Sequence, residues 1–434
     1  MSLPKNCLYT NKINSSYARN FNSVIQPQNG DAQLGDTIIF NVPTGNSLVM
    51  SGADTMLKFD LTIKAGGATL ANCIKLNKCG AYGCFQRLRI FHGGTLLSDI
   101  DHYANLMEMI FPVQQSSDAL VGKYRILAGT DYTGGASINA ADIANNVEIT
   151  TSYCIPLLSI LTWTNNYVPL FAMSGSPLRI ELQVVSSMNH LCKSFVQAVA
   201  PTVKNLLTKI ELVTNMIELS DTGMNIIKQS IGNGPLQWVT QDYRNYGNNI
   251  VIPDATVTTV SVPVPAKFNS LNSLFFSFRE YSSGVWKYHA LESNAFKLEE
   301  YFLRVGSRTM PVKPPNTKPE FYSELLRAFG TVTDVNQECS ITIEQYTKDV
   351  AVEMAGAEGV GAQQSGAFYV GVDMESYSNT SNDTIYSGTN TSTDDIFGVF
   401  RFGSIAGANN VRIDSYALFD QLVLIQNGVC TVNY

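Results

Sequence analysis

The sequence predicts an all-β protein built from two related halves. Short segments rich in β-branched and aromatic residues recur along most of the 434 residues, and clusters of Gly, Pro, Asn and Ser separate them. Few segments have a helical period, and many strands with few helices are typical of β-sandwiches and barrels. One short helical pattern occurs twice, each time after a similar strand and turn. This repetition indicates that the second half copies the first.

The predicted strands form two series. The first series consists of "DTIIFNVP", "MLKFDLTIKA", "FQRLRIF", "PLRIELQVV" and "TKIELVTNMIEL". After about residue 235 the second series consists of "LQWVTQDYRNY", "ATVTTVSVPVPA", "SLFFSFRE", "FYVGVDMES", "FGVFRFG" and "DQLVLIQNGVCTV". Their partial alternation of apolar and polar residues fits strands with one buried face.

Two helices are expected at corresponding places. "DHYANLMEMIF" follows "RLRIFHGGTLL", with Asp101 as the expected N-cap, and "PEFYSELLRAFG" follows "YFLRVGSRTMP". Pro319 suits the first turn of the second helix, and Gly330 suits its end. Both helices carry apolar residues at positions i, i+3, i+4 and i+7, namely Tyr103, Leu106, Met107 and Ile110 in the first and Tyr322, Leu325, Leu326 and Phe329 in the second. We therefore expect one apolar stripe on each helix to face a core.

The shared order of strand, turn and helix predicts an internal duplication. "LRI" at Leu88–Ile90 precedes the first helix, as "LRV" at Leu303–Val305 precedes the second. Between the series, Ser220 begins a segment that ends in Gly and Pro, as a short linker helix would. The expected organisation is an N-terminal arm at residues 1–30, a first half at 31–219, a linker helix at 220–235 and a second half at 236–434.

The composition limits the possible functions. Hydrophobic residues make up 45% of the chain and charged residues 15%, below the roughly 25% of typical soluble domains. Such a chain has a large interior or buries much of its surface against partners. The net charge of −7 argues against direct nucleic-acid binding, which requires concentrated Lys and Arg.

The sequence predicts a soluble protein of intracellular origin. The first thirty residues contain no apolar signal-peptide core, and Pro156 and Pro169 interrupt the longest uncharged span. Eight cysteines are scattered without a CxxC pair, so we expect reduced, mostly buried thiols.

No catalytic, cofactor-binding or metal-binding residue is predicted, and we expect no enzyme. Several partial matches to known sites fail on their spacing or context: Cys79, Cys84, His92 and His102 as zinc ligands, "DALVGKY" as a phosphate loop, "GVGAQQSG" as a dinucleotide turn, and Asp99 with Asp101 or Glu299 with Glu300 as glycosidase carboxylates. The acidic pairs are better interpreted as capping or solvated groups.

Three segments are expected to be long loops. They are small, polar and Gly-rich, and they cover residues 128–146, 355–367 and 376–395. The third contains the sequons at Asn379, Asn382 and Asn390, and a fourth sequon lies at Asn14. A polar loop explains them better than glycosylation, although the sequence leaves glycosylation open.

A set of stretches in a fixed order resembles a known family. These stretches are "DTIIFNVPTG", "TMLKFDLTIKAG", "RLRIFHGGTLLSDIDHYANLMEMI", "KIELVTNMIELSD", "WVTQDYRNYG", "LRVGSRTMPVKPPNTKPEFYSELLRAFG", "FYVGVDMESY" and "YALFDQLVLIQNGVCTVNY". Together they resemble the double jelly-roll major capsid proteins of eukaryotic DNA viruses. The resemblance is closest to the polinton-like virus and adintovirus group, and more distant to virophages and nucleocytoplasmic large DNA viruses.

The resemblance implies a fold and a function. The fold would be two eight-stranded antiparallel jelly rolls side by side, with a few short helices in the connections. The function would be that of a structural virion protein, made and assembled inside the host cell, whose homotrimers form pseudo-hexagonal capsomers that tile an icosahedral shell. Implied partners are other copies of the chain, penton and minor capsid proteins, and an internal membrane or membrane protein. The three loops would face outward, and residues 1–30 would face inward.

Two other functions remain open at this stage. A double jelly-roll assembly scaffold would share the fold but be absent from mature virions. A carbohydrate-binding β-sandwich module would also be rich in strands and non-catalytic, but it should gather aromatic and acidic residues on its loops, where this chain has mainly Gly, Ala, Ser, Thr and Asn.

Overall fold

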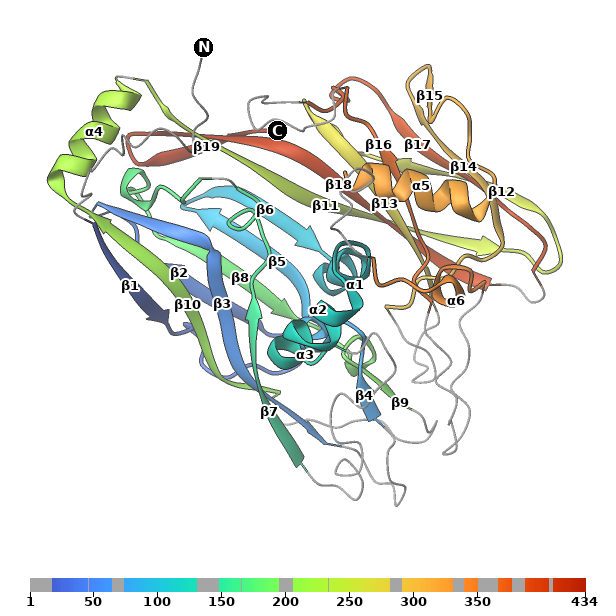
Figure 1. Cartoon of the computed structure of the whole chain (residues 1–434), viewed down its shortest axis with the longest axis horizontal. Helices are drawn as coiled ribbons and strands as arrows, with labels where there is room; N and C mark the ends of the chain where they lie inside the picture. Colours follow the sequence, from blue (N-terminus) through green and yellow to red (C-terminus); the bar gives the residue numbers. More distant parts are fainter. Residues whose placement is uncertain are drawn as a thin grey trace, which may run out of the picture.

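The structure is a computed structural model of the chain. It describes residues 18–45, 47–64, 74–130, 148–164, 166–194, 206–232, 234–281, 291–330, 339–349, 366–376, 387–405 and 409–434. Figure 1 shows two β-sandwiches side by side along the longest axis of the molecule.

The first sandwich contains two four-stranded antiparallel sheets. Their orders are β1-β10-β3-β7 and β2-β8-β5-β6, and a small β4-β9 pair lies apart. The strands are β1 (Ala18–Ile25), β2 (Thr37–Val42), β3 (Leu48–Lys64), β4 (Ile74–Leu76), β5 (Phe85–His92), β6 (Thr95–Asp101), β7 (Glu148–Pro156), β8 (Leu178–Val184), β9 (Cys192–Ser194) and β10 (Leu207–Leu219). The helices are α1 (Tyr103–Gln114), α2 (Ser117–Val121) and α3 (Lys123–Ala128), with short 3₁₀ turns η2 (Gly80–Cys84), η3 (Leu170–Ala172) and η4 (Met188–His190).

The second sandwich repeats this arrangement. Its sheets are ordered β11-β18-β13-β16, with β19 added beside β18, and β12-β17-β14-β15. The strands are β11 (Leu236–Ile252), β12 (Thr258–Val264), β13 (Leu271–Glu280), β14 (Leu298–Val305), β15 (Arg308–Met310), β16 (Tyr369–Asp373), β17 (Ile396–Phe402), β18 (Asn409–Gln426) and β19 (Val429–Asn433). The helices are α5 (Lys318–Ala328) and α6 (Ile343–Tyr346), and α4 (Asp221–Ile231) joins the two halves.

The two sandwiches correspond strand by strand. When β1, β2, β3, β5, β6, β7, β8 and β10 are replaced by β11, β12, β13, β14, β15, β16, β17 and β18, both sheet orders of the first half become those of the second. The correspondence includes the helices, because α1 follows the β5–β6 hairpin and α5 follows the β14–β15 hairpin. The predicted fold of two eight-stranded antiparallel units with few short helices is therefore confirmed.

Each sandwich buries alternate residues of facing sheets. In the first half, Phe59 of β3 packs edge-on against Phe85 of β5, with ring centroids 5.6 Å apart. In the second half, Phe276 and Phe278 of β13 pack against Phe400 of β17, at 5.1 and 5.3 Å. On β3 and β13, the residues that alternate with these aromatic residues consequently project from the outer faces of the two sheets.

The predicted boundaries need one correction. Residues 18–25 were expected in an N-terminal arm, but they form β1, which pairs with β10 along its whole length. The first half therefore begins before residue 31, because β1 is one of its eight strands. In the expected linker, Ser220 caps α4 by accepting a hydrogen bond from the backbone N–H of Gly223.

The two expected helices exist, but details of each differ from the prediction. His102, not Asp101, is the N-cap of α1, and Asp101 instead accepts a hydrogen bond from the His102 backbone N–H at 2.9 Å. Helix α1 is buried from Tyr103 to Val113, well beyond the expected stripe. In α5, Pro319 lies in the first turn and Gly330 follows the end with a positive φ, as expected. Its fully buried residues are Phe321, Leu325 and Ala328, so of the four expected stripe residues only Leu325 is fully buried.

The described flanks of the expected loops 128–146 and 355–367 lie at one end of the molecule. The flanks of the third expected loop, 376–395, lie at the opposite end, because Asp373 pairs with Ser273 and Thr389 with Leu271 at the start of β13. The last residue of β3, Lys64, lies opposite the first residue of β7, Glu148. In the second half, Glu280 at the end of β13 lies opposite Val411 near the start of β18. Lys78 donates a hydrogen bond to the Gly366 carbonyl, so these ends of the two halves adjoin. Most of the three expected loops lies outside the described ranges.

Candidate functional site

The most extensive feature that involves both halves is the junction between them. From the first half it uses β6, α1 and the segment 157–164; from the second it uses the sheet β11-β18-β13-β16 with β19. Because Phe276 and Phe278 point into the sandwich, Ser277 and Arg279 point outward from β13, and both contact the first half. The junction therefore covers the outer face of that sheet.

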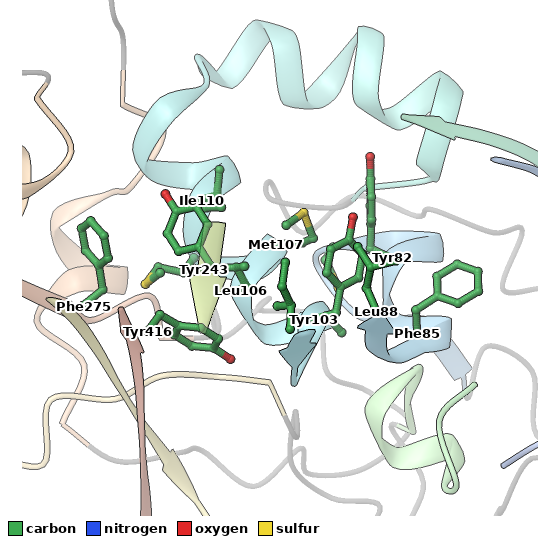
Figure 2. Close-up of a cluster of buried hydrophobic side chains, with 14 of the residues drawn as sticks. Tyr82, Phe85, Leu88, Tyr103, Leu106, Met107, Ile110, Tyr243, Phe275 and Tyr416 are labelled. Carbon is green, nitrogen blue, oxygen red and sulfur yellow. The ribbon is translucent and has the colours of Figure 1, made fainter. Parts of the chain in front are cut away.

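Helix α1 is the apolar centre of the junction. Figure 2 shows its residues Leu106, Met107 and Ile110 between aromatic side chains of both halves: Tyr82, Phe85 and Tyr103 on one side and Tyr243, Phe275 and Tyr416 on the other. These helix residues are at most 5% exposed. Because apolar residues occur on all its faces and even its polar residues Asn105 and Glu108 are buried, α1 is stable only when it is enclosed, and the two sandwiches enclose it.

Hydrogen bonds between α1 and side chains of the second half fix the orientation of the helix. Asn105 donates to the hydroxyls of Tyr416 (2.9 Å) and Ser277 (3.2 Å), and the Tyr369 hydroxyl donates to the carbonyl of Glu108 (3.2 Å). Beside the helix, Trp163 of the first half packs on Tyr243 of β11, with centroids 4.9 Å apart. Directed polar contacts of this kind specify one relative orientation of the halves.

A buried ionic cluster closes one side of the junction. Asp414 of β18 accepts hydrogen bonds from Arg279 Nε at 2.7 Å and Arg412 Nε at 2.9 Å. Arg412 also donates to Nε2 of His102 at 2.7 Å, while Arg279 lies 3.4 Å from Nδ1 of the same ring. Asp414 is completely buried. The single first-half member, His102, is the N-cap of α1 and has a positive φ of 49°.

The cluster sets the protonation state of its members. Burial and the charges of Arg279 and Arg412 lower the pKa of His102 to about 4. Burial likewise lowers the pKa of the nearby His190 to about 4, with Arg279 and His102 adding to the effect. Burial alone would raise the pKa of Asp414, but Arg279, His102 and Arg412 outweigh it and lower the pKa to about 2. At neutral pH the carboxylate is therefore charged and both imidazoles are neutral.

A second buried carboxyl group lies between β6 and β11. Ser98 donates to Oδ1 of Asp242 at 2.9 Å, and Gln421 donates to the carbonyl of Leu97 at 2.7 Å. Burial raises the pKa of Asp242 to about 8, despite the opposing hydrogen bond from Ser98. Asp242 is thus mainly protonated at neutral pH, and a buried negative charge is avoided.

At the β19 end of the molecule, the junction contains a backbone contact between the two halves. The N–H of Gly175 donates to the carbonyl of Gly428 at 3.1 Å, and Thr95 donates to the carbonyl of Cys430 at 3.0 Å. A Cβ on Gly175 would lie 2.5 Å from the Gly428 oxygen, so only glycine fits there without movement.

The residues considered as catalytic or metal-binding groups form other contacts in the structure. His92 lies 3.0 Å from the carbonyl of Met173, Cys79 lies beside Glu108, and His102 belongs to the ionic cluster. In "DALVGKY", residues 117–121 and 123–128 form α2 and α3. Asp99 pairs with Arg87 at 2.7 Å and Glu299 with Arg401 at 3.3 Å. Within the part of the chain that the structure describes, no three His, Cys, Asp or Glu side chains are placed to hold a metal ion.

Other expectations can be placed only in part. The described cysteines Cys79, Cys84, Cys154, Cys339 and Cys430 are free thiols. Asn390 is exposed and accepts hydrogen bonds from Ser392, whereas Asn14, Asn379 and Asn382 fall in ranges that the structure does not describe. Among the described helices, none is long and apolar enough to span a membrane.

Comparison with solved structures assigns the fold. The whole architecture matches the Faustovirus major capsid protein, with a TM-score of 0.62 at 10% identity, over 98% of this chain and 93% of the other. It matches PBCV-1 VP54, fitted into a reconstruction of the virophage Sputnik, with a TM-score of 0.62 at 11% identity, over 98% and 100%. The mavirus major capsid protein gives a TM-score of 0.56 at 11% identity, over 100% and 93%. The chain has the double jelly-roll fold. No protein-family model and no curated protein sequence matches the chain.

The sequence did not predict the residues of the ionic cluster at the junction. The members of the ionic cluster are far apart in the chain, at positions 102, 279, 412 and 414, and no motif joins them. The one available signal was the run of apolar residues beyond the stripe of α1, including Met109, Phe111 and Val113. An all-round apolar helix indicates enclosure on every side, and here two jelly rolls enclose it.

Proposed function

We propose that this protein is a major capsid protein whose copies tile an icosahedral virion shell. The observation that carries the proposal is the complete double jelly-roll architecture, with two corresponding eight-stranded units in one chain. Full-length similarity to proteins named as major capsid proteins of Faustovirus and mavirus supports it. The virion shell is the corresponding location.

The geometry suits a rigid building block. A buried junction of apolar, hydrogen-bonded and ionic contacts holds the two jelly rolls in one orientation. The ends of both units that carry the expected loops 128–146 and 355–367 point the same way, while β1 begins beside α4 toward the opposite end, where the flanks of 376–395 also lie. We infer that the end that carries the loops 128–146 and 355–367 faces outward and that the α4 end faces the interior of the shell, so that only two of the three expected loops would lie on the outer surface.

The proposal includes a set of partners and a division of the chain. Each chain contributes two similar sides, so three chains would complete a pseudo-hexagonal capsomer. Penton and minor capsid proteins and an internal membrane are the proposed further partners. The functional units are a first jelly roll that includes β1, the linker containing α4, and a second jelly roll at 236–434.

We infer a structural rather than a catalytic role. The buried charged residues described at the junction bind one another or backbone groups, and they lie within packed protein instead of a solvent-filled cleft. Titratable groups in such networks have shifted pKa values for structural reasons.

Quantitative proteomics of purified mature virions tests the proposal. A major capsid protein should be the most abundant polypeptide in the particles, in many copies per genome. An assembly scaffold would instead be abundant in infected cells and scarce in mature particles, which would contradict the proposed role. Glycan-array binding without any particle association would favour a carbohydrate-binding module.

A further inference from the structure

An apolar row crosses the outer face of the sheet β1-β10-β3-β7. Val24 pairs with Val213, Val213 with Met56, and Met56 with Pro156, so these residues lie side by side on four strands. Directly opposite residues project from the same face. Val24 is 53% exposed, and the other three are half-buried. We call these four residues the outer row.

Charged residues border the outer row. Lys58 pairs with Glu211 at 3.3 Å, and Lys209 pairs with Asp60 at 2.8 Å. The charges of these two pairs cancel, and one further exposed carboxylate, Asp54, lies beside the row, where it accepts hydrogen bonds from Ser51 and Asn215. An apolar strip inside a polar rim is the usual composition of a protein interface.

The corresponding sheet of the second jelly roll is already covered. Its outer face packs against β6 and α1 of the first jelly roll, through contacts such as Ser98 with Asp242 and Asn105 with Tyr416. Because β1, β10, β3 and β7 correspond to β11, β18, β13 and β16, the open sheet is the counterpart of the covered one. The junction within the chain thus shows what kind of element fits this face.

The elements that would provide the same kind of contact to a second copy lie on the far side of the molecule. The counterparts of β6 and α1 are β15 and α5, and Figure 1 shows them at the opposite end of the long axis from β1. Val312, in the connection from β15 to α5, is 94% exposed. Helix α1 is buried almost throughout, whereas α5 fully buries only Phe321, Leu325 and Ala328.

We propose that the β15–α5 edge around Val312 of one copy docks on the outer row of another copy and repeats the junction that joins the two jelly rolls within the chain. The inference rests on the proposed self-assembly and names the surfaces that carry it. Each copy offers one edge and one face on opposite sides. Such a head-to-tail contact can close into a ring.

Site-specific photo-crosslinking tests the contact. The photoreactive residue p-benzoylphenylalanine replaces Val312, and unlabelled protein is mixed with ¹⁵N-labelled protein before irradiation. We expect mixed-label crosslinks from position 312 to peptides of β1, β3, β7 or β10. The same residue in place of Ile343, which is 79% exposed on α6, serves as the control and should not reach that sheet.

A charge substitution provides an independent measurement. Val312→Glu would place an unpaired carboxylate against the apolar row, so we expect the concentration for half-assembly to rise about tenfold or more, while Ile343→Glu leaves it unchanged. Oligomers that crosslink from position 312 to other surfaces, or that tolerate Val312→Glu, would overturn this inference but leave the proposed function intact. A protein that stays monomeric would overturn both.

Discussion

At the scale of single residues, one buried carboxylate lies at the centre of the ionic cluster between the two jelly rolls. Asp414 is the anionic partner of Arg279 and Arg412, and these arginines in turn surround His102 of the other jelly roll. A buried charge is tolerated only while its partner remains, so the cluster is sensitive to the loss of any one charge.

Asp414→Asn removes that charge without changing the size of the side chain. It leaves the buried Arg279 and the half-buried Arg412 without a carboxylate, and we expect the free energy of unfolding to fall by about 3–5 kcal/mol in urea titrations of the unassembled protein. Asp395→Asn is the matched control, because Asp395 is 74% exposed in its pair with Lys267 and should matter by less than about 1 kcal/mol. Equal effects of the two substitutions would show that the cluster does not stabilise the junction.

The pH dependence of stability follows from His102, His190 and Asp242. The two histidines have pKa values of about 4 when folded and about 6.5 when unfolded, so the unfolded chain binds more protons and stability is lost as the pH falls from 6.5 to 4. Asp242 has a pKa of about 8 when folded, against about 3.9 when unfolded, so its effect is opposite and stability is lost as the pH rises toward 8. On the acid side the two histidines act against Asp242, so these three groups together contribute a loss of about 1.4 kcal/mol per pH unit as the pH falls. On the alkaline side Asp242 alone contributes a loss of similar size as the pH rises.

Stability measured by urea titration from pH 4 to pH 8 should therefore be greatest near pH 6.5. Asp242→Asn should flatten the alkaline side and leave the acid side steeper, whereas His102→Gln should reduce the slope on the acid side. If the Asp242→Asn variant still loses stability as the pH rises toward 8, another group releases the proton that causes this loss.

At the scale of elements, the duplicated helices have diverged in their surroundings. Helix α1 lies between two jelly rolls, while α5 packs mainly on β16 and β13 of its own jelly roll. The start and end of α5 could be predicted because Pro319 and Gly330 are local signals. The enclosure of α1 could not be deduced from its stripe, because it depends on Tyr243 and Tyr416, more than a hundred residues away.

Strand β1 shows a second limit of sequence reasoning. Its sequence "ARNFNSVI" contains three polar residues among its first five and only partial alternation, because one face of this edge strand is open to solvent. The apolar pattern that identifies β3 and β10 is therefore weak in β1. Pairing with β10 along its whole length stabilises β1 as a strand, although its own sequence pattern predicts a strand only weakly.

The junction also has a steric requirement at the end near β19. Gly175→Ala would bring a Cβ to 2.5 Å from the carbonyl oxygen of Gly428, and we expect a loss of about 1–3 kcal/mol in the free energy of unfolding. Gly94→Ala is the control, because a Cβ there meets no atom within 4 Å and should change stability by about 0.5 kcal/mol or less. A neutral Gly175→Ala variant would mean that the turn before β19 moves away freely.

At the scale of the whole molecule, two similar units in one chain allow six similar sides to be formed by three chains. The sheet β11-β18-β13-β16 is covered within the chain, whereas its counterpart β1-β10-β3-β7 is open. The molecule therefore has an open sheet on one side and, on the other side, the β15–α5 edge that we propose covers the open sheet of a second copy. Sequence reasoning reached the duplication and the double jelly roll, while this asymmetry required the structure, because only the contacts distinguish a buried face from an open one.

Native mass spectrometry of the purified protein across a range of concentrations tests the central claim most directly. We expect a closed trimer at about three times the chain mass of 47.5 kDa, or larger assemblies in multiples of that trimer. A species of one chain mass at every concentration would contradict it.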